Sequence, residues 1–327
     1  MQKAERVFHL NKIEEERNSK VIVYITSDRQ PLQFCSGVIA TDILTLFYTH
    51  LKKIGKADKI SLCIRSSGGN LDAPWPLVNL IREYCKEFEI IVLSKALSAG
   101  TLIALGANKI VMTPIAQLSP IDPKKNIVNK SEKQIGLEVE DVISFINLAK
   151  EKIGLTEQTC LSEILKSLVN DVPTYALGSV NRTHSLIRSL SSNLLMLHLK
   201  DGEEGEKQKN IIVEYLTEKL FSHLHLINRK EAKETVGFGD IIEYADNELE
   251  ILINNVDDTY SQELELTEPF IPLKVLGENA TTSYTSKRAI LESIEITNTF
   301  VSELEITKIQ TEPEPQVNVK VKFQGWK

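Results

Sequence analysis

The N-terminal third of the chain alternates short apolar runs with amphipathic segments, a pattern that few folds accommodate. The apolar runs have the length and composition of buried strands, and the segments between them have helical spacing. Such alternation predicts a mostly parallel sheet with right-handed crossovers and an α/β fold. The predicted strands are 20–25, 60–65, 89–94 and 109–113, and the predicted helices are 41–54, 73–87 and 98–107.

A serine stands where one of these strands turns into a helix. The segment Leu97-Ser98-Ala99-Gly100-Thr101 follows the apolar run 89–94 and opens a helix of small residues. The first N–H groups of a helix have no partner within it, so they can stabilise negative charge. A nucleophilic serine benefits from such donors. Ser98 is therefore a candidate nucleophile and Ala99 N–H a candidate oxyanion donor, although a serine here is also a common N-cap.

Paired glycines follow the neighbouring strand, in the segment Ser66-Ser67-Gly68-Gly69. Glycines allow the backbone to turn its N–H groups toward a substrate carbonyl, although the pair also occurs in ordinary turns. Ligands of open parallel sheets bind at the carboxyl ends of the strands. Both Gly68-Gly69 and Ser98 follow such ends, so the sequence predicts one site there.

These motifs resemble the Clp peptidase/crotonase superfamily, and most closely its serine dehydrogenase proteinase family. The resemblance spans 1–245 and implies stacked βαβ units with a helical cover, related to the signal peptide peptidase A-type serine peptidases. It implies that Ser98 is the nucleophile and that Gly68 or Gly69 acts with Ala99 as the oxyanion hole. The segments that carry it are Ser66-Ser67-Gly68-Gly69, Leu97-Ser98-Ala99-Gly100-Thr101, Leu118-Ser119-Pro120-Ile121-Asp122-Pro123, 176–182 and 222–232.

The sequence leaves the general base open. Ile121 stands where Clp peptidases carry a histidine, and Glu138 stands where the signal peptide peptidase relatives carry a lysine. His223 is one candidate base, beside the position of the Clp triad aspartate, with Asp122 as a candidate orienting group. A lysine of the loop before Glu138 is a second candidate. The third possibility is that the chain has no competent base. The loop lysines are Lys124, Lys125, Lys130 and Lys133.

Composition narrows the class of protein. The net charge of −7 and the lack of a basic stripe argue against nucleic-acid binding. The longest apolar stretch, 97–107, is too short for a membrane span, and the N-terminus resembles an amphipathic helix rather than a secretory signal. No metal-ligand spacing or nucleotide-binding glycine motif occurs, so neither a metal nor a cofactor is expected. The four cysteines form no CxxC pair, and we expect a reduced, cytoplasmic protein.

The composition changes along the chain and predicts two parts. Residues 1–245 form the Clp peptidase/crotonase-like domain, with helices dominating 139–235. Residues 246–327 are rich in β-branched residues and are expected to form a β-rich C-terminal appendage. We expect that appendage to contact a partner protein or a second copy of the chain.

Three functions fit these observations. The first is a homo-oligomeric serine peptidase, a hydrolase of peptide or protein substrates, which a separate partner protein could activate. The second is a catalytically weak or inactive assembly protein of the same fold, which the residues at Ile121 and Glu138 favour. The third, a crotonase-like acyl-transfer enzyme, is disfavoured because crotonases typically carry glycines where Ser98-Ala99 stand.

Overall fold

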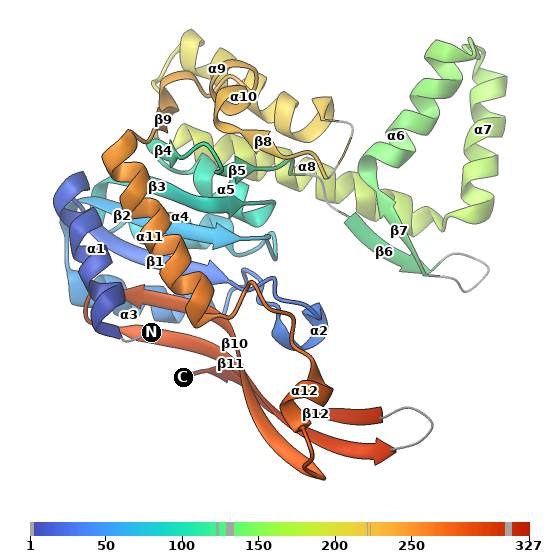
Figure 1. Cartoon of the computed structure of the whole chain (residues 1–327). Helices are drawn as coiled ribbons and strands as arrows, with labels where there is room; N and C mark the ends of the chain where they lie inside the picture. The colour runs from blue at the N-terminus through green and yellow to red at the C-terminus, as the bar shows by residue number, and fades with distance from the viewer. Residues whose placement is uncertain (1–2, 122–123, 129–133, 221, 223, 311–315) are drawn as a thin grey trace. The chain divides into compact units, whose positions relative to one another are not determined.

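The computed structural model describes residues 3–121, 124–128, 134–220, 222, 224–310 and 316–327 (Figure 1). The chain forms two compact units, which we describe separately. The larger unit comprises residues 1–118 and 227–327, and the smaller comprises 119–226.

A parallel sheet forms the centre of the larger unit, as the alternating pattern predicts. Its strands lie in sequence order, and a further strand from the C-terminal half joins its far edge. These strands are β1 (Lys20–Thr26), β2 (Ala57–Ser66), β3 (Cys85–Ala96), β4 (Lys109–Met112) and β9 (Ile242–Tyr244). The connecting helices are α3 (Ile43–Ile54), α4 (Pro74–Arg82) and α5 (Ala99–Leu105). The predicted strand and helix order is confirmed.

Two helices, α1 (Lys3–Arg17) and α11 (Asn247–Glu263), contact each other and cover one face of this sheet (Figure 1). The alternation of side chains along a strand explains the arrangement, because odd-numbered residues of β1 face these helices. Val21, Val23 and Ile25 share a buried cluster with both helices. On the other face Tyr24 packs edge-to-face against Phe47 of α3, with 5.7 Å between the ring centroids.

The strands β10 (Thr281–Ser293), β11 (Thr297–Gln310) and β12 (Gln316–Trp326) of the expected β-rich region pair antiparallel with one another in sequence order. They continue the main sheet, because β10 pairs antiparallel with β1 and gives the order β12-β11-β10-β1-β2-β3-β4-β9. The first part of the predicted β-rich region is helical instead: α11 begins after Asp246, whose carboxylate caps it by accepting the N–H of Leu249 at 2.9 Å. The boundary at residue 245 stays a prediction.

The smaller unit is mainly helical, in agreement with the sequence. A two-stranded hairpin lies where we expected the lysine-containing loop. The elements are β6 (Lys124–Val128), β7 (Gln134–Glu138), α6 (Val139–Asn147), the π-helix η1 (Leu148–Lys152), α7 (Gln158–Asp171), α8 (Thr174–Met196), α9 (Glu203–Glu214) and the π-helix η2 (Tyr215–Lys219).

Short elements connect the parts of the larger unit. The two-residue strand β5 pairs with the end of β3 and with β8. These elements are α2 (Leu32–Cys35), β5 (Gln117–Leu118), β8 (Ile227–Asn228), α10 (Arg229–Glu234), the 3-10 helix η3 (Gly239–Ile241) and α12 (Pro272–Leu276).

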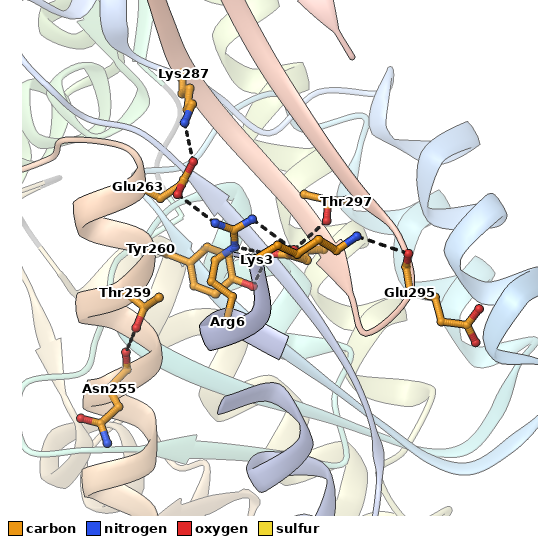
Figure 2. A network of polar contacts seen from close by, with 10 residues as sticks. Lys3, Arg6, Asn255, Thr259, Tyr260, Glu263, Lys287, Glu295 and Thr297 are labelled. Atoms are coloured by element: carbon orange, nitrogen blue, oxygen red, sulfur yellow. Dashed lines mark hydrogen bonds and ion pairs between the residues drawn. The ribbon is translucent and has the colours of Figure 1, made fainter. Parts of the chain in front are cut away.

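A buried ionic network joins the first helix of the chain to its C-terminal strands (Figure 2). The Glu292 side chain is fully buried on β10 and accepts the Nε–H of Arg6 at 2.6 Å. It also accepts the hydroxyls of Tyr260 at 2.7 Å and Thr297 at 2.6 Å. Arg6 donates further to Glu263 of α11 at 2.8 Å. A carboxylate without water requires such partners, so α1, α11 and β10 depend on one another.

We expect Arg6→Met to lower the free energy of unfolding by about 3–5 kcal/mol, because Glu292 would keep a buried charge without its cation. Lys12→Met is the matched control, since the Lys12–Glu15 ion pair on the same helix is exposed and such pairs contribute little. Urea-induced unfolding of both variants measures the difference. Equal losses would contradict the assigned role of the network.

Candidate functional site

The strand-to-helix turn at Ser98 has an unusual backbone. β3 ends at Ala96 and α5 begins at Ala99, and Ser98 between them has φ 51° and ψ −112°. Positive φ in a residue other than glycine costs about 1–3 kcal/mol and is concentrated at functional sites. Hydrogen bonds on both sides hold the turn: Gly100 N–H donates to Leu97 O at 2.8 Å, and the Thr101 hydroxyl donates to Ala96 O at 2.7 Å.

The pairing of β2 with β3 brings the glycine turn to this serine. Ile64 pairs with Val92 but Ser66 pairs with Ala96, so β3 contains two additional residues where the register shifts. As a result, the turn after β2 and the turn after β3 begin at the same height along the sheet. A Cβ added to Gly68 would come within 2.8 Å of Ser98 Cβ. Gly68 also has φ 110°, so two independent constraints favour glycine here.

The second glycine is held from the other side by Ile39. Ile39 N–H donates to Gly68 O at 2.9 Å, and Asn70 N–H donates to Ile39 O at 2.7 Å. These two bonds form an isolated parallel bridge between Ile39 and Gly69. In such a bridge Gly69 uses neither its own N–H nor its own carbonyl. A Cβ on Gly69 would overlap the Ile39 backbone, so this close approach also requires glycine.

The three candidate oxyanion donors differ in their partners. Gly68 N–H donates to the Ser66 hydroxyl oxygen at 3.0 Å. Over the residues that the structure describes, the N–H groups of Gly69 and Ala99 have no acceptor. Ala99 is fully buried, and a buried N–H without an acceptor is costly. Gly69 and Ala99 are therefore the two donors available to a bound oxygen.

Sequence reasoning did not identify the hydroxyl pair of Ser66 and Thr26, which lies beside the glycine turn. Ser66 Oγ, fully buried, lies 2.7 Å from Thr26 Oγ1 and accepts Gly68 N–H. The carbonyl of Ser66 accepts Leu97 N–H at 3.0 Å. Ser66 thus connects the glycine turn to the serine turn. Its place in the Ser-Ser-Gly-Gly motif was a usable signal, whereas Thr26 becomes visible only through the pairing of β1 with β2.

Most of the candidate bases fall outside the part of the chain that the structure describes. His223, Asp122, Lys130 and Lys133 lie outside the described residues, as do the side chains of Lys124, Lys125 and Glu138. Ile121 is described and buried, and its N–H donates to Leu216 O at 3.0 Å within the smaller unit. The structure therefore identifies no base.

The buried thiols are poor competing nucleophiles. All four cysteines are free, and Cys63 lies fully buried on β2, the strand that leads to the glycines. Burial raises the pKa of the Cys63 thiol and raises that of Cys85 to about 11. Both thiols are therefore protonated at neutral pH, in a form that is neither nucleophilic nor metal-binding.

Within the described part of the chain, no group of three His, Cys, Asp or Glu side chains is placed to hold a metal ion. Among the helices it describes, none combines the length and the apolar character needed to cross a bilayer.

The larger unit thus holds a serine in a strained strand-to-helix turn beside a glycine turn, on a sheet of βαβ units. Residues 1–239 match the family of ClpP-like SDH-type serine proteinases, and the chain belongs to that family. The family and the Clp peptidase/crotonase fold expected from the motifs are confirmed.

The individual proteins that the chain resembles share less than 30% of its sequence. A curated relative, the uncharacterized protein MJ0137 of Methanocaldococcus jannaschii, is 28% identical over 235 residues, covering 69% of this chain and 70% of the relative. A solved structure of the 1510-N membrane-bound stomatin-specific protease with a substrate peptide is 20% identical, with a TM-score of 0.37, covering 70% of this chain and 78% of that one. A putative enoyl-CoA hydratase from Streptomyces coelicolor is 13% identical, with a TM-score of 0.33 and 78% coverage of both chains.

We expect Gly68→Ala to destabilise the protein more than Gly55→Ala does. Both glycines have positive φ, for which an alanine loses about 1–2 kcal/mol, but a Cβ at Gly55 meets nothing within 4 Å. The clash with Ser98 should add about 1–3 kcal/mol at Gly68. Urea-induced unfolding of the two variants gives the difference, and equal losses would show that the glycine does not need its space beside Ser98.

Proposed function

We propose that this chain is a serine peptidase in which Ser98 Oγ attacks the carbonyl carbon of a peptide bond. The observation that carries the proposal is the strained Ser98 turn beside two N–H groups that lack acceptors in the described chain. Membership of a serine proteinase family supports the same chemistry.

The two glycines have different roles in this proposal. Gly69 and Ala99 N–H groups bind the oxygen that becomes negatively charged in the tetrahedral intermediate, which is where donors are most effective. Gly68 N–H is already bonded to Ser66, so its part is to leave room for Ser98 and to fix the turn. Of the candidate pair Gly68 and Gly69, the second is the better oxyanion donor.

The reaction proceeds in two halves. A base takes the Ser98 hydroxyl proton while Oγ bonds to the carbonyl carbon, and the protonated base then delivers that proton to the departing amine as the C–N bond breaks. Water repeats the sequence on the acyl-enzyme and releases the carboxylate. We propose His223 as the base, with a loop lysine such as Lys133 as the alternative.

We propose a homo-oligomer that acts on peptide or protein substrates in the cytoplasm. The homo-oligomer is supported by the smaller unit, which exposes large apolar side chains on its helices and beside them, where surfaces in contact with water usually carry polar ones. Tyr175 is 76% exposed and Ile153 is 61% exposed. Phe145 and Leu148 on α6 and η1 are also exposed.

Labelling with a fluorophosphonate, followed by intact mass, tests the nucleophile. We expect one adduct on the native chain and none on Ser98→Ala, because only an activated serine reacts at an appreciable rate. A folded native protein that stays unlabelled would favour the alternative function, a catalytically weak or inactive assembly protein of the same fold. Comparing His223→Ala with Lys133→Ala in the same assay identifies the base, since nucleophile and base act as one unit.

The hydroxyl pair makes a separate prediction about rate. Ser66→Ala removes the acceptor of Gly68 N–H, and we expect the labelling rate constant of Ser98 to fall by roughly tenfold or more. Thr26→Val should lower it in the same direction, and Thr26→Ser, which keeps the hydroxyl, should restore it. Ser67→Ala is the control, because the neighbouring Ser67 is exposed. If Ser66→Ala and Ser67→Ala label at the same rate, the pair does not position the site.

A further inference from the structure

Apart from the candidate catalytic site, the larger unit contains a pocket at its C-terminal strands. Its volume is about 240 Å³, and its walls come from the segment before α3 and from β10, β11 and β12. This pocket contains none of the candidate catalytic residues, and four of its main side chains lie beyond the residues that match the peptidase family. The side chains that define it are Val38, Asp42, Arg288, Phe300, Gln324 and Trp326.

Arg288 contributes a positive charge that has no carboxylate partner in the described chain. Its Nε donates to Ser36 O, and its Nη1 donates to Ser302 Oγ at 3.0 Å and to Gln324 Oε1 at 2.6 Å. The Nη2 donors and the Gln324 amide N–H₂ have no acceptor among the described residues. Half-burial lowers the pKa of the Arg288 guanidinium, because a cation loses hydration there without a counter-ion. An anion at Nη2 would supply that counter-ion.

Asp42 contributes a negative charge to the same pocket. Its Oδ2 accepts the indole N–H of Trp326 at 2.8 Å, and over the described residues its Oδ1 has no partner. Gln324, which holds Arg288, and Trp326, which holds Asp42, stand two residues apart on β12. Alternate residues of a strand lie about 7 Å apart on one face. The Arg288 guanidinium and the Asp42 carboxylate therefore lie near each other, at a separation that a small molecule can bridge.

The remaining walls are apolar. Phe300 and Trp326 meet edge-to-face with 5.4 Å between their ring centroids, and Arg288 stands 5.8 Å from the Phe300 centroid. Val38, which is 58% exposed, and the buried Ala289 also line the pocket. The pocket is smaller than the usual 300–1,000 Å³ of sites for drug-sized ligands, which favours a molecule the size of a single residue.

We infer that this pocket binds a free amino acid with an apolar side chain. The α-carboxylate accepts from Arg288 Nη2 and the Gln324 amide, the α-ammonium donates to Asp42 Oδ1, and the side chain lies against Phe300, Trp326 and Val38. The inference does not depend on the peptidase proposal, because the ligand touches neither Ser98 nor the glycine turn.

Trp326 reports directly on the pocket. The chain has two tryptophans, so Trp75→Phe leaves Trp326 as the only indole emitter. Titration of this variant with L-leucine, which does not fluoresce, should give a saturable change in emission. Leucine that leaves the emission unchanged up to its solubility, with no heat of binding by calorimetry, would overturn the inference.

Two leucine analogues test the need for both charges on the unaltered pocket. 4-Methylpentanoate lacks the ammonium group and 3-methylbutylamine lacks the carboxylate. Each should bind at least about tenfold more weakly than leucine, because a hydrogen bond to a charged group contributes about 1.5–3 kcal/mol. If 4-methylpentanoate bound as tightly as leucine, the pocket would be a plain anion site and the inference would be wrong.

Calorimetry on variants assigns the groups. Asp42→Asn keeps an oxygen for the Trp326 indole but loses the charge, and it should weaken leucine binding by about tenfold or more. Arg288→Gln should weaken it at least as far. Lys320→Gln, a charge change on β12 outside the pocket, is the control and should leave the affinity unchanged. If Arg288→Gln fails to fold, Asp42→Asn and the analogue series still decide, and native affinity in Asp42→Asn would overturn the inference.

Discussion

The register shift between β2 and β3 is the constraint on which the candidate site depends. Ile64 pairs with Val92, yet Ser66 pairs with Ala96. With uniform pairing, the chain after β3 would run about 7 Å further along the sheet before turning. The shift brings Ala96 opposite Ser66, and the hydrogen bond of 3.0 Å from Leu97 N–H to Ser66 O then joins the two turns. Contact between Ser98 and Gly68 follows from that alignment.

The backbone strain at Ser98 is offset by the hydrogen bonds that surround it. Its positive φ costs about 1–3 kcal/mol, whereas a typical hydrogen bond contributes about 0.5–1.5 kcal/mol net. Three hydrogen bonds lie within three residues of Ser98, with Gly100 N–H, Leu97 N–H and the Thr101 hydroxyl as their donors. Together they offset the strain, and the fully buried helix α5 fixes the chain beyond it. A rigid turn of this kind holds a reactive group without rearrangement.

The sequence predicted the local elements well and the long-range contacts poorly. Hydrophobic periodicity placed the central strands and the Ser98 turn because these depend on neighbouring residues. Helix α11 was missed although Leu249, Ile253, Val256 and Tyr260 recur at helical spacing, since β-branched residues further along dominated the interpretation. The β6–β7 hairpin was missed because its lysine-rich sequence resembles a solvated loop.

Contacts between distant segments were beyond sequence reasoning for a physical reason. The contact of Ser66 with Thr26 depends on the pairing of β1 with β2, which no single segment specifies. The same holds for Asp42 and Trp326.

The pairing of β1 with β10 has a consequence for synthesis of the chain. Arg6 and Glu292, the partners that fasten the two ends, are 286 residues apart in sequence. During translation β1 leaves the ribosome long before its antiparallel neighbour β10, which lies more than 250 residues further along the chain. Until then an apolar strand has an open edge, which favours intermolecular pairing. β1 is thus fully paired only after β10 has been made, and this slow, non-local closure of the sheet is the step most exposed to aggregation.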